Sequence, residues 1–104
     1  MRWYHFVAYF FAGAFLANAI PHLTNGISGR PFPSPFATPP GQGESSSTIN
    51  VLWGMFNVVV GYVLLRYVGT FDIRKPWHAT TVGVGATAMA IGLARGFGQL
   101  YGGL

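Results

Sequence analysis

Three apolar stretches dominate the pattern of this chain. They cover roughly residues 3–19, 49–65 and 79–93, and the few charged residues fall almost entirely between them or at their ends. Each stretch approaches the ~20 residues that an α-helix needs to cross a lipid bilayer. The pattern therefore predicts an all-α integral membrane protein, with three transmembrane helices in a single membrane domain over residues 1–104.

Turn-forming and capping residues set the expected boundaries. Pro21 pushes the residue before it out of the α region, which ends the first helix. Ser47 and Thr48 are typical N-caps for the second helix, and Pro76 suits the first turn of the third. We expect a first helix over about 3–20, an outer loop over 21–47, a second helix over about 48–68, a short basic loop over 69–76 and a third helix over about 77–98.

The long outer loop does not have the composition of a flexible linker. It is rich in proline and glycine, which excludes a regular helix, but it also contains Leu23, Ile27, Phe32 and Phe36. Disordered segments normally lack such apolar residues. We therefore expect an ordered loop that covers the outer ends of the helices or docks on a neighbour.

The start of the chain also resembles a secretory signal. Arg2 precedes an apolar run that leads to Ala17-Asn18-Ala19, a pattern typical of cleavage sites. The run is, however, heavy in bulky aromatic residues such as Trp3 and Phe10. This composition favours a retained first membrane helix over a signal peptide.

Composition supports a membrane environment and excludes several functions. The chain is 51% hydrophobic and only 8% charged, whereas soluble domains carry ~25% charged residues. The net charge is +4, but no cluster of basic residues lies on a soluble element, so nucleic acid is not an expected partner. Because there is no cysteine, thiolate catalysis and cysteine-ligated metal sites are excluded. Membrane lipids are expected as partners.

The distribution of basic residues predicts the topology. Loops on the cytoplasmic side of a membrane are enriched in Lys and Arg. On the two predicted sides, the basic residues divide four against two: Arg2, Arg66, Arg74 and Lys75 against Arg30 and Arg95. We expect the N-terminus inside and the C-terminus outside, in a bacterial cytoplasmic (inner) membrane.

Small and amide residues mark candidate helix-packing faces. On the second helix, one face carries Asn50, Gly54, Asn57 and Gly61. Small residues let helices approach in a membrane, and Asn can hydrogen-bond across them. This face can be a packing seam within the chain, a polar lining or a contact with another subunit. The third helix carries wider rows of small residues than one neighbour requires: Ala86, Ala90, Gly92, Ala94 and Gly96.

Polar residues near the outer side form a second candidate site, made of Asn18, His22, Arg30, Glu44 and Arg95. A charged residue such as Arg95 within a membrane helix is a functional candidate, although its long side chain can also reach the interface. At the inner end, His5 and His78 lie on different helices. They allow a bis-histidine haem as a hypothesis, but a structural role is the simpler interpretation, and no cofactor or metal is predicted.

No catalytic constellation appears, because there is no pair of acids on one side and no hydrolase or phosphate-binding motif. We do not expect an enzyme. The first hypothesis is a non-catalytic accessory subunit that packs with other integral membrane subunits in a larger complex, an energy-transducing one among the options. The alternative is a self-assembling pore, carrier or small-molecule-binding membrane protein. The third is a haem- or quinone-associated redox subunit.

Overall fold

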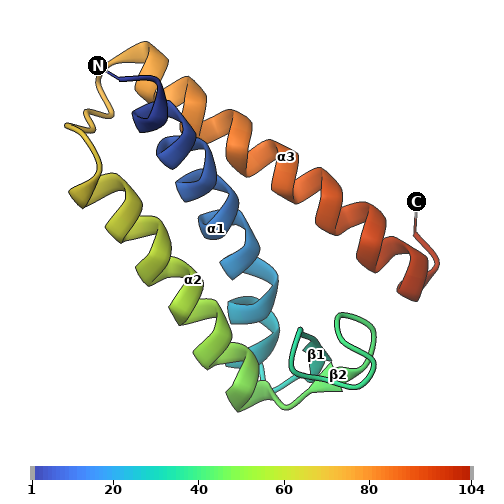
Figure 1. Cartoon of the computed structure of the whole chain (residues 1–104). Coiled ribbons are helices and arrows are strands. Elements are labelled where there is room, and N and C mark those ends of the chain that lie inside the picture. The colour runs from blue at the N-terminus through green and yellow to red at the C-terminus, as the bar shows by residue number, and fades with distance from the viewer. Residues whose placement is uncertain (1, 104) are drawn as a thin grey trace.

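The computed structural model describes residues 2–103, and three long α-helices account for most of them (Figure 1). The helices are α1 (Trp3–Ile27), α2 (Ser47–Tyr67) and α3 (Pro76–Tyr101). Two short strands, β1 (Phe32–Pro33) and β2 (Glu44–Ser45), pair antiparallel, with Phe32 opposite Ser45. With 71% of the chain helical, the predicted three-helix, mostly α architecture is confirmed.

The first helix is the centre of the fold. Figure 1 shows α1 between α2 and α3, with the N-terminus and the α2–α3 connection at one end and the loop of residues 28–46 at the other. Against α3, the closest approach is at two glycines. A Cβ on Gly13 would overlap the Val82 carbonyl, and a Cβ on Gly85 would overlap the Phe10 carbonyl. Glycine therefore brings the two backbones into contact.

The packing of α1 against α2 is of a different kind, because leucines of α1 fill the space above glycines of α2. A Cβ on Gly54 would lie 2.6 Å from the Leu23 side chain, and one on Gly61 would lie 2.7 Å from Leu16. Each leucine thus occupies the notch that a glycine leaves. Close packing of this kind is the main attraction between helices in a membrane, where lipid is as apolar as the side chains.

The prediction that the first helix ends before Pro21 is wrong, because α1 continues through Pro21 to Ile27. Proline costs ~3 kcal/mol inside a helix, since it lacks an N–H and its ring meets the carbonyl four residues earlier. Contacts with α2 hold the last turns in place. His22 is hydrogen-bonded to Asn50 at 2.7 Å, and Gly26 lies so close to Ser47 that no side chain would fit.

The other helix ends have ordinary local causes. Ser46, rather than Ser47 or Thr48, is the N-cap of α2, and its hydroxyl accepts from the Ile49 N–H at 3.2 Å. Pro76 begins α3 as expected. Gly102 follows α3 with φ +81°, a left-handed conformation that commonly ends helices and that glycine adopts without strain.

Two helices, α1 and α2, are long and apolar enough to cross a membrane. This finding agrees with the prediction of a membrane protein. The third helix is equally long but does not reach the same apolarity, because threonine, glycine, glutamine and arginine interrupt its apolar residues. Its only buried residues, within the described part of the chain, are His78 and Gly85. Most of α3 is therefore uncovered.

Candidate functional site

The amide and glycine face of α2 lies against α1. The four buried residues of α2 are the four that share this face in the sequence: Asn50, Gly54, Asn57 and Gly61. The two glycines receive leucines of α1, and the two asparagines bring polar groups into the contact. Side-chain amides in such a position need partners, because a buried amide without a hydrogen bond costs several kcal/mol, about 4–8 in a purely apolar solvent.

Asn57 finds its partners on α1 and within its own helix. The Asn18 side-chain amide donates to Asn57 Oδ1 at 3.0 Å, and Asn57 Nδ2 donates to the Trp53 carbonyl at 2.7 Å. Because Asn57 Nδ2 faces a carbonyl, its Oδ1 must be the acceptor of the Asn18 hydrogen bond. The pair therefore has a defined direction, and it joins α1 to α2.

Asn50 connects α1, α2 and both strands of the loop. Its side chain is fully buried, and the two hydrogens of its Nδ2 are shared among the carbonyls of Phe32 (3.0 Å), Ser45 (3.2 Å) and Ser46 (3.0 Å). Oδ1 is consequently left to accept, so the His22 Nδ1–H donates to it at 2.7 Å. In the neutral His22 ring, this leaves Nε2 with a free lone pair.

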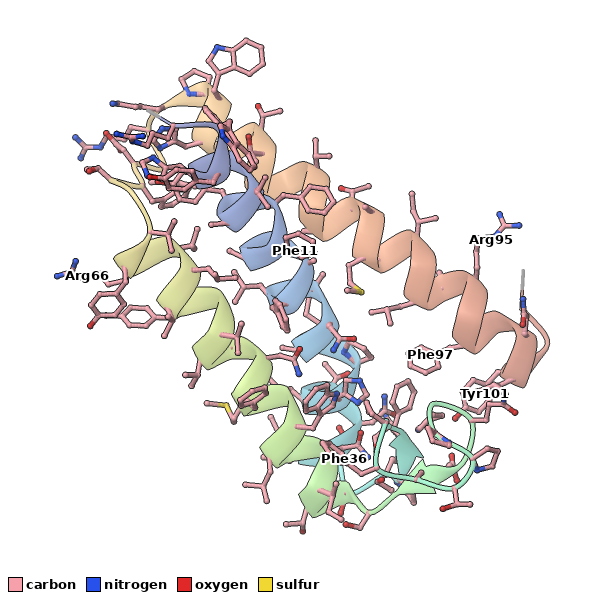
Figure 2. The ribbon with its side chains drawn as sticks, in the orientation of Figure 1. Phe11, Phe36, Arg66, Arg95, Phe97 and Tyr101 are labelled. Carbon is pink, nitrogen blue, oxygen red and sulfur yellow. The ribbon has the colours of Figure 1, made fainter. Side chains whose placement is uncertain are left out.

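The loop is held by further buried groups. Ser34 and Ser45, both buried, share a hydroxyl–hydroxyl hydrogen bond of 2.6 Å. Phe32 packs edge-on against Phe97 of α3, with ring centroids 4.7 Å apart. The Tyr101 hydroxyl donates to Glu44 at 3.2 Å. The loop thus reaches from the end of the α1–α2 pair to the last turns of α3 (Figure 2).

A cavity of about 270 Å³ lies where α1, α2, α3 and the loop meet. Its wall is formed by Asn18, His22, Pro33, Ser34, Pro35, Gly41, Trp53, Leu93 and Phe97. The indole Nε1–H of Trp53 is buried and has no hydrogen-bond partner in the part of the chain that the structure describes. A wider groove of about 550 Å³ continues from it along α3, and the two share Gly41, Leu93 and Phe97.

The predicted outer polar site does not come together as one cluster. Asn18 and His22 line the cavity, but Arg30 is exposed and its Nε donates to Asn25 at 3.2 Å. Glu44 accepts from Tyr101 and not from Arg95. Arg95 is exposed and extends from α3 away from the other helices, on the opposite side from Phe97 (Figure 2). The rotation of α3 about its axis separates these side chains.

The two inner histidines differ in burial and in hydrogen bonding. His78 is 3% exposed, lies among the rings of Phe6, Tyr9 and Phe71, and accepts the Asp72 N–H through Nδ1 at 2.9 Å. His5 is partly exposed, and its Nδ1 lies 3.4 Å from the Arg2 N–H. His78 thus shapes the α2–α3 connection. A haem bound by His5 and His78 stays an untested hypothesis.

The small residues of α3 are mostly exposed. Ala86 is half-buried, whereas Ala90, Gly92, Ala94 and Gly96 are exposed. An added Cβ on Gly92 or Gly96 would meet no atom within 4 Å. The contact with α1 instead uses Gly85, which the sequence reasoning missed. Trp53 was also missed as a cavity residue, although its spacing of three from Asn50 and four from Asn57 places it beside them on α2.

Comparison of the chain with protein-family models, with curated proteins and with solved structures gives no match. Function is therefore argued from the geometry alone.

Proposed function

We propose that the protein is a small, non-catalytic integral membrane subunit that packs through α3 against other integral membrane subunits of a larger complex. The observation that carries this proposal is the uncovered face of α3. That face forms a shallow groove lined by small, hydroxyl and branched residues: Thr80, Gly83, Val84, Thr87, Ala88 and Ile91.

This composition suits a protein neighbour better than lipid. Small residues let a second helix approach closely, and threonine hydroxyls can hydrogen-bond across the contact. The outer face of α2 provides the contrast, because it exposes large apolar side chains such as Leu52, Phe56 and Val59. Bulky apolar groups of this kind match a lipid surface. The two sides of the molecule therefore favour lipid on α2 and protein on α3.

The lower apolarity of α3 gives a second reason. As the third transmembrane helix of this proposal, it would place Thr80, Thr87 and Arg95 in or near hydrocarbon. Charged groups in membrane segments usually face protein or water, and Arg95 extends away from this chain's own helices (Figure 2). A neighbouring subunit that covers α3 would supply partners for these groups. Hetero-oligomeric assembly is the proposal, with a homo-oligomer as the competing outcome.

The proposed topology follows from the ends of the helices. The start of α1, the end of α2 and the start of α3 lie at one end of the molecule (Figure 1). Four basic residues lie at or next to these helix ends in the sequence: Arg2, Arg66, Arg74 and Lys75. Cytoplasmic enrichment of basic residues would place it inside, with the loop and the C-terminus outside, in a bacterial inner membrane.

The test is purification from native membrane in a mild detergent, with native mass spectrometry as the measurement. The wild-type chain is expected to carry larger membrane proteins in a fixed ratio. Gly83→Leu should abolish the association of the chain with these larger proteins. A Cβ at Gly83 meets no atom of the chain itself within 4 Å, so the added side chain would act only on a neighbouring subunit. Val59→Leu on the exposed face of α2 is the matched control and should keep the partners.

Two results would contradict the proposal. If the wild-type chain is isolated without any larger protein, it is not a subunit of a stable complex. If Gly83→Leu keeps its partners, α3 is not the contact. A mass equal to a multiple of this chain would replace the larger complex by self-assembly, which is the basis of the pore or carrier hypothesis.

A further inference from the structure

The cavity beside α3 contains hydrogen-bonding groups that the fold itself does not use. Trp53 Nε1–H is a donor that is buried without a partner. His22 is 2% exposed, and its Nδ1–H is engaged by Asn50, so that Nε2 of the neutral ring can only accept. No hydrogen bond to Nε2 is made in the part of the chain that the structure describes. One donor and one acceptor therefore remain in the cavity wall.

Asn18 adds a second acceptor to the same wall. Its Nδ2 donates to Asn57 Oδ1, so its own Oδ1 is the free end of the amide. Ser34 contributes no further free group, because its Oγ is bonded to Ser45 and accepts from the Phe36 N–H at 3.1 Å. Of these free groups, the Trp53 Nε1–H is the buried one, and a buried polar group without a partner is costly. These free groups consequently favour an occupant that both donates and accepts.

The rest of the wall restricts the occupant further. Among the described residues that line the cavity, none carries a formal charge, and Pro33, Pro35, Leu93 and Phe97 supply an apolar surface. The cavity continues into the wider groove along α3, where Leu93, Phe97 and Leu100 lie beside the polar residues Gln42 and Gln99. A hydroxyl among the free polar groups and an apolar body against Leu93, Phe97 and Leu100 would match both parts.

We propose that this cavity binds an uncharged amphiphile through a hydroxyl head group, with its apolar chain against Leu93, Phe97 and Leu100 of α3. A hydroxyl supplies one donor and can accept as well, so one group can accept from Trp53 Nε1–H and donate to His22 Nε2 or Asn18 Oδ1. Membrane alcohols and phenols share this chemistry. The site does not depend on the assembly through α3 proposed above, because it lies on the inner side of that helix.

The test uses the full chain in phosphatidylcholine vesicles with Trp53 as the only tryptophan. Trp3 and Trp77 are 76% and 75% exposed, so Trp3→Phe and Trp77→Phe remove their fluorescence with little effect on packing. Three brominated probes of equal chain length then quench Trp53 on contact. They are 2-bromoundecan-1-ol, 2-bromoundecane and 2-bromoundecanoate, which carry the bromine next to the end that holds a hydroxyl, no head group and a carboxylate, respectively.

The bromoalcohol is expected to quench Trp53 saturably and to bind about tenfold more tightly than the bromoalkane, the equivalent of about 1.4 kcal/mol for its hydrogen bonds. Leu93→Phe, made in the same background, puts a ring into the cavity and should weaken this binding by a similar factor. Ile91→Phe is the matched control, because Ile91 lies on the uncovered face of α3 and is 55% exposed. It should leave the affinity unchanged.

Other results would overturn the proposal. Linear quenching by all three probes would mean partition into lipid and a cavity filled by water. Equal affinity for alcohol and alkane would mean that the free polar groups take no part. Tighter binding of the carboxylate would indicate an anion site at a charged His22. Saturable binding of unchanged affinity in Leu93→Phe would place the probe in a different apolar hollow. That hollow is lined by Trp53 together with Phe36, Ile49, Leu52 and Phe56.

Discussion

Replacing Asn50 by leucine tests whether one buried amide holds the loop to the helices. Leucine has a similar size but no polar atom, so Asn50→Leu keeps the volume and removes every side-chain hydrogen bond. The His22 Nδ1–H would lose its partner. The carbonyls of Phe32 and Ser45 would each lose one of two hydrogen bonds. Pro33 has no N–H, so the opposed residues Phe32 and Ser45 are the pair that exchanges backbone hydrogen bonds. The Ser46 carbonyl likewise still accepts from the backbone N–H of residue 50 at 3.1 Å.

The magnitude follows from these groups. A buried hydrogen-bonding group that loses its only partner costs about 1–3 kcal/mol, and measured side-chain hydrogen bonds between membrane helices lie near the lower end of that range. At about 1 kcal/mol for His22 and about 0.5 kcal/mol for each of the two strand carbonyls, Asn50→Leu should reduce the free energy of unfolding by about 2 kcal/mol. Asn57→Leu leaves only the Asn18 amide without its partner, so its expected cost is about 1 kcal/mol.

The assay compares the two variants in mixed detergent micelles. Unfolding is followed by circular dichroism as the fraction of denaturing detergent rises, and hydrogen exchange of residues 28–46 is read by mass spectrometry. Asn50→Leu should be the less stable variant, and it alone should accelerate exchange in the loop. Equal destabilisation by the two variants, or a protected loop in Asn50→Leu, would refute the reasoning that Asn50 is the main attachment.

Two further predictions concern the helices. Gly85→Leu should separate α1 from α3, because a Cβ at this position overlaps the Phe10 carbonyl; a loss of about 3 kcal/mol or more is expected from such overpacking, and it can be measured in the same detergent titration, where Gly83→Leu should be neutral. A Gly85→Leu protein as stable as wild type would contradict the close contact. Pro21→Ala should raise the free energy of unfolding by about 1–3 kcal/mol, since it restores the N–H missing within α1. A decrease would show that the proline shapes a bend that the contact with α2 requires.

Local patterns were sufficient to predict the three helices and the residues that share the buried face of α2. Apolar runs and a spacing of four, three and four along Asn50, Gly54, Asn57 and Gly61 depend only on helix geometry. The end of α1 could not be found in this way. The effect of Pro21 on its neighbours is local, whereas the contacts that overcome it, those of His22 and Gly26, are made with residues of α2 that are distant in sequence.

The candidate site was predictable only in part. Asn18 and His22 were recognised as polar residues near the loop, but their grouping with Arg30, Glu44 and Arg95 assumed a rotation of α3 that the sequence does not determine. Small residues occur on several sides of α3, so its pattern does not say which glycine faces α1. Gly85 faces it, whereas Gly83, Gly92 and Gly96 border open space. Trp53 entered the site for a similar reason, because the position of the loop decides what encloses its indole ring.

The hydrogen bonds around Asn50 and Asn57 have a consequence for the order of events during synthesis. Every partner in this network, from Asn18 to Asn57, belongs to α1, the loop or α2. No group of α3 takes part in these bonds, and the glycine contact of α3 is made with the opposite side of α1. A nascent chain that has inserted α1 and α2 as a hairpin already contains every group of this network, and only the contacts of Phe32 with Phe97 and of Glu44 with Tyr101 wait for α3. The third helix then docks onto a finished surface, and its arrival, rather than the folding of the loop, completes the cavity.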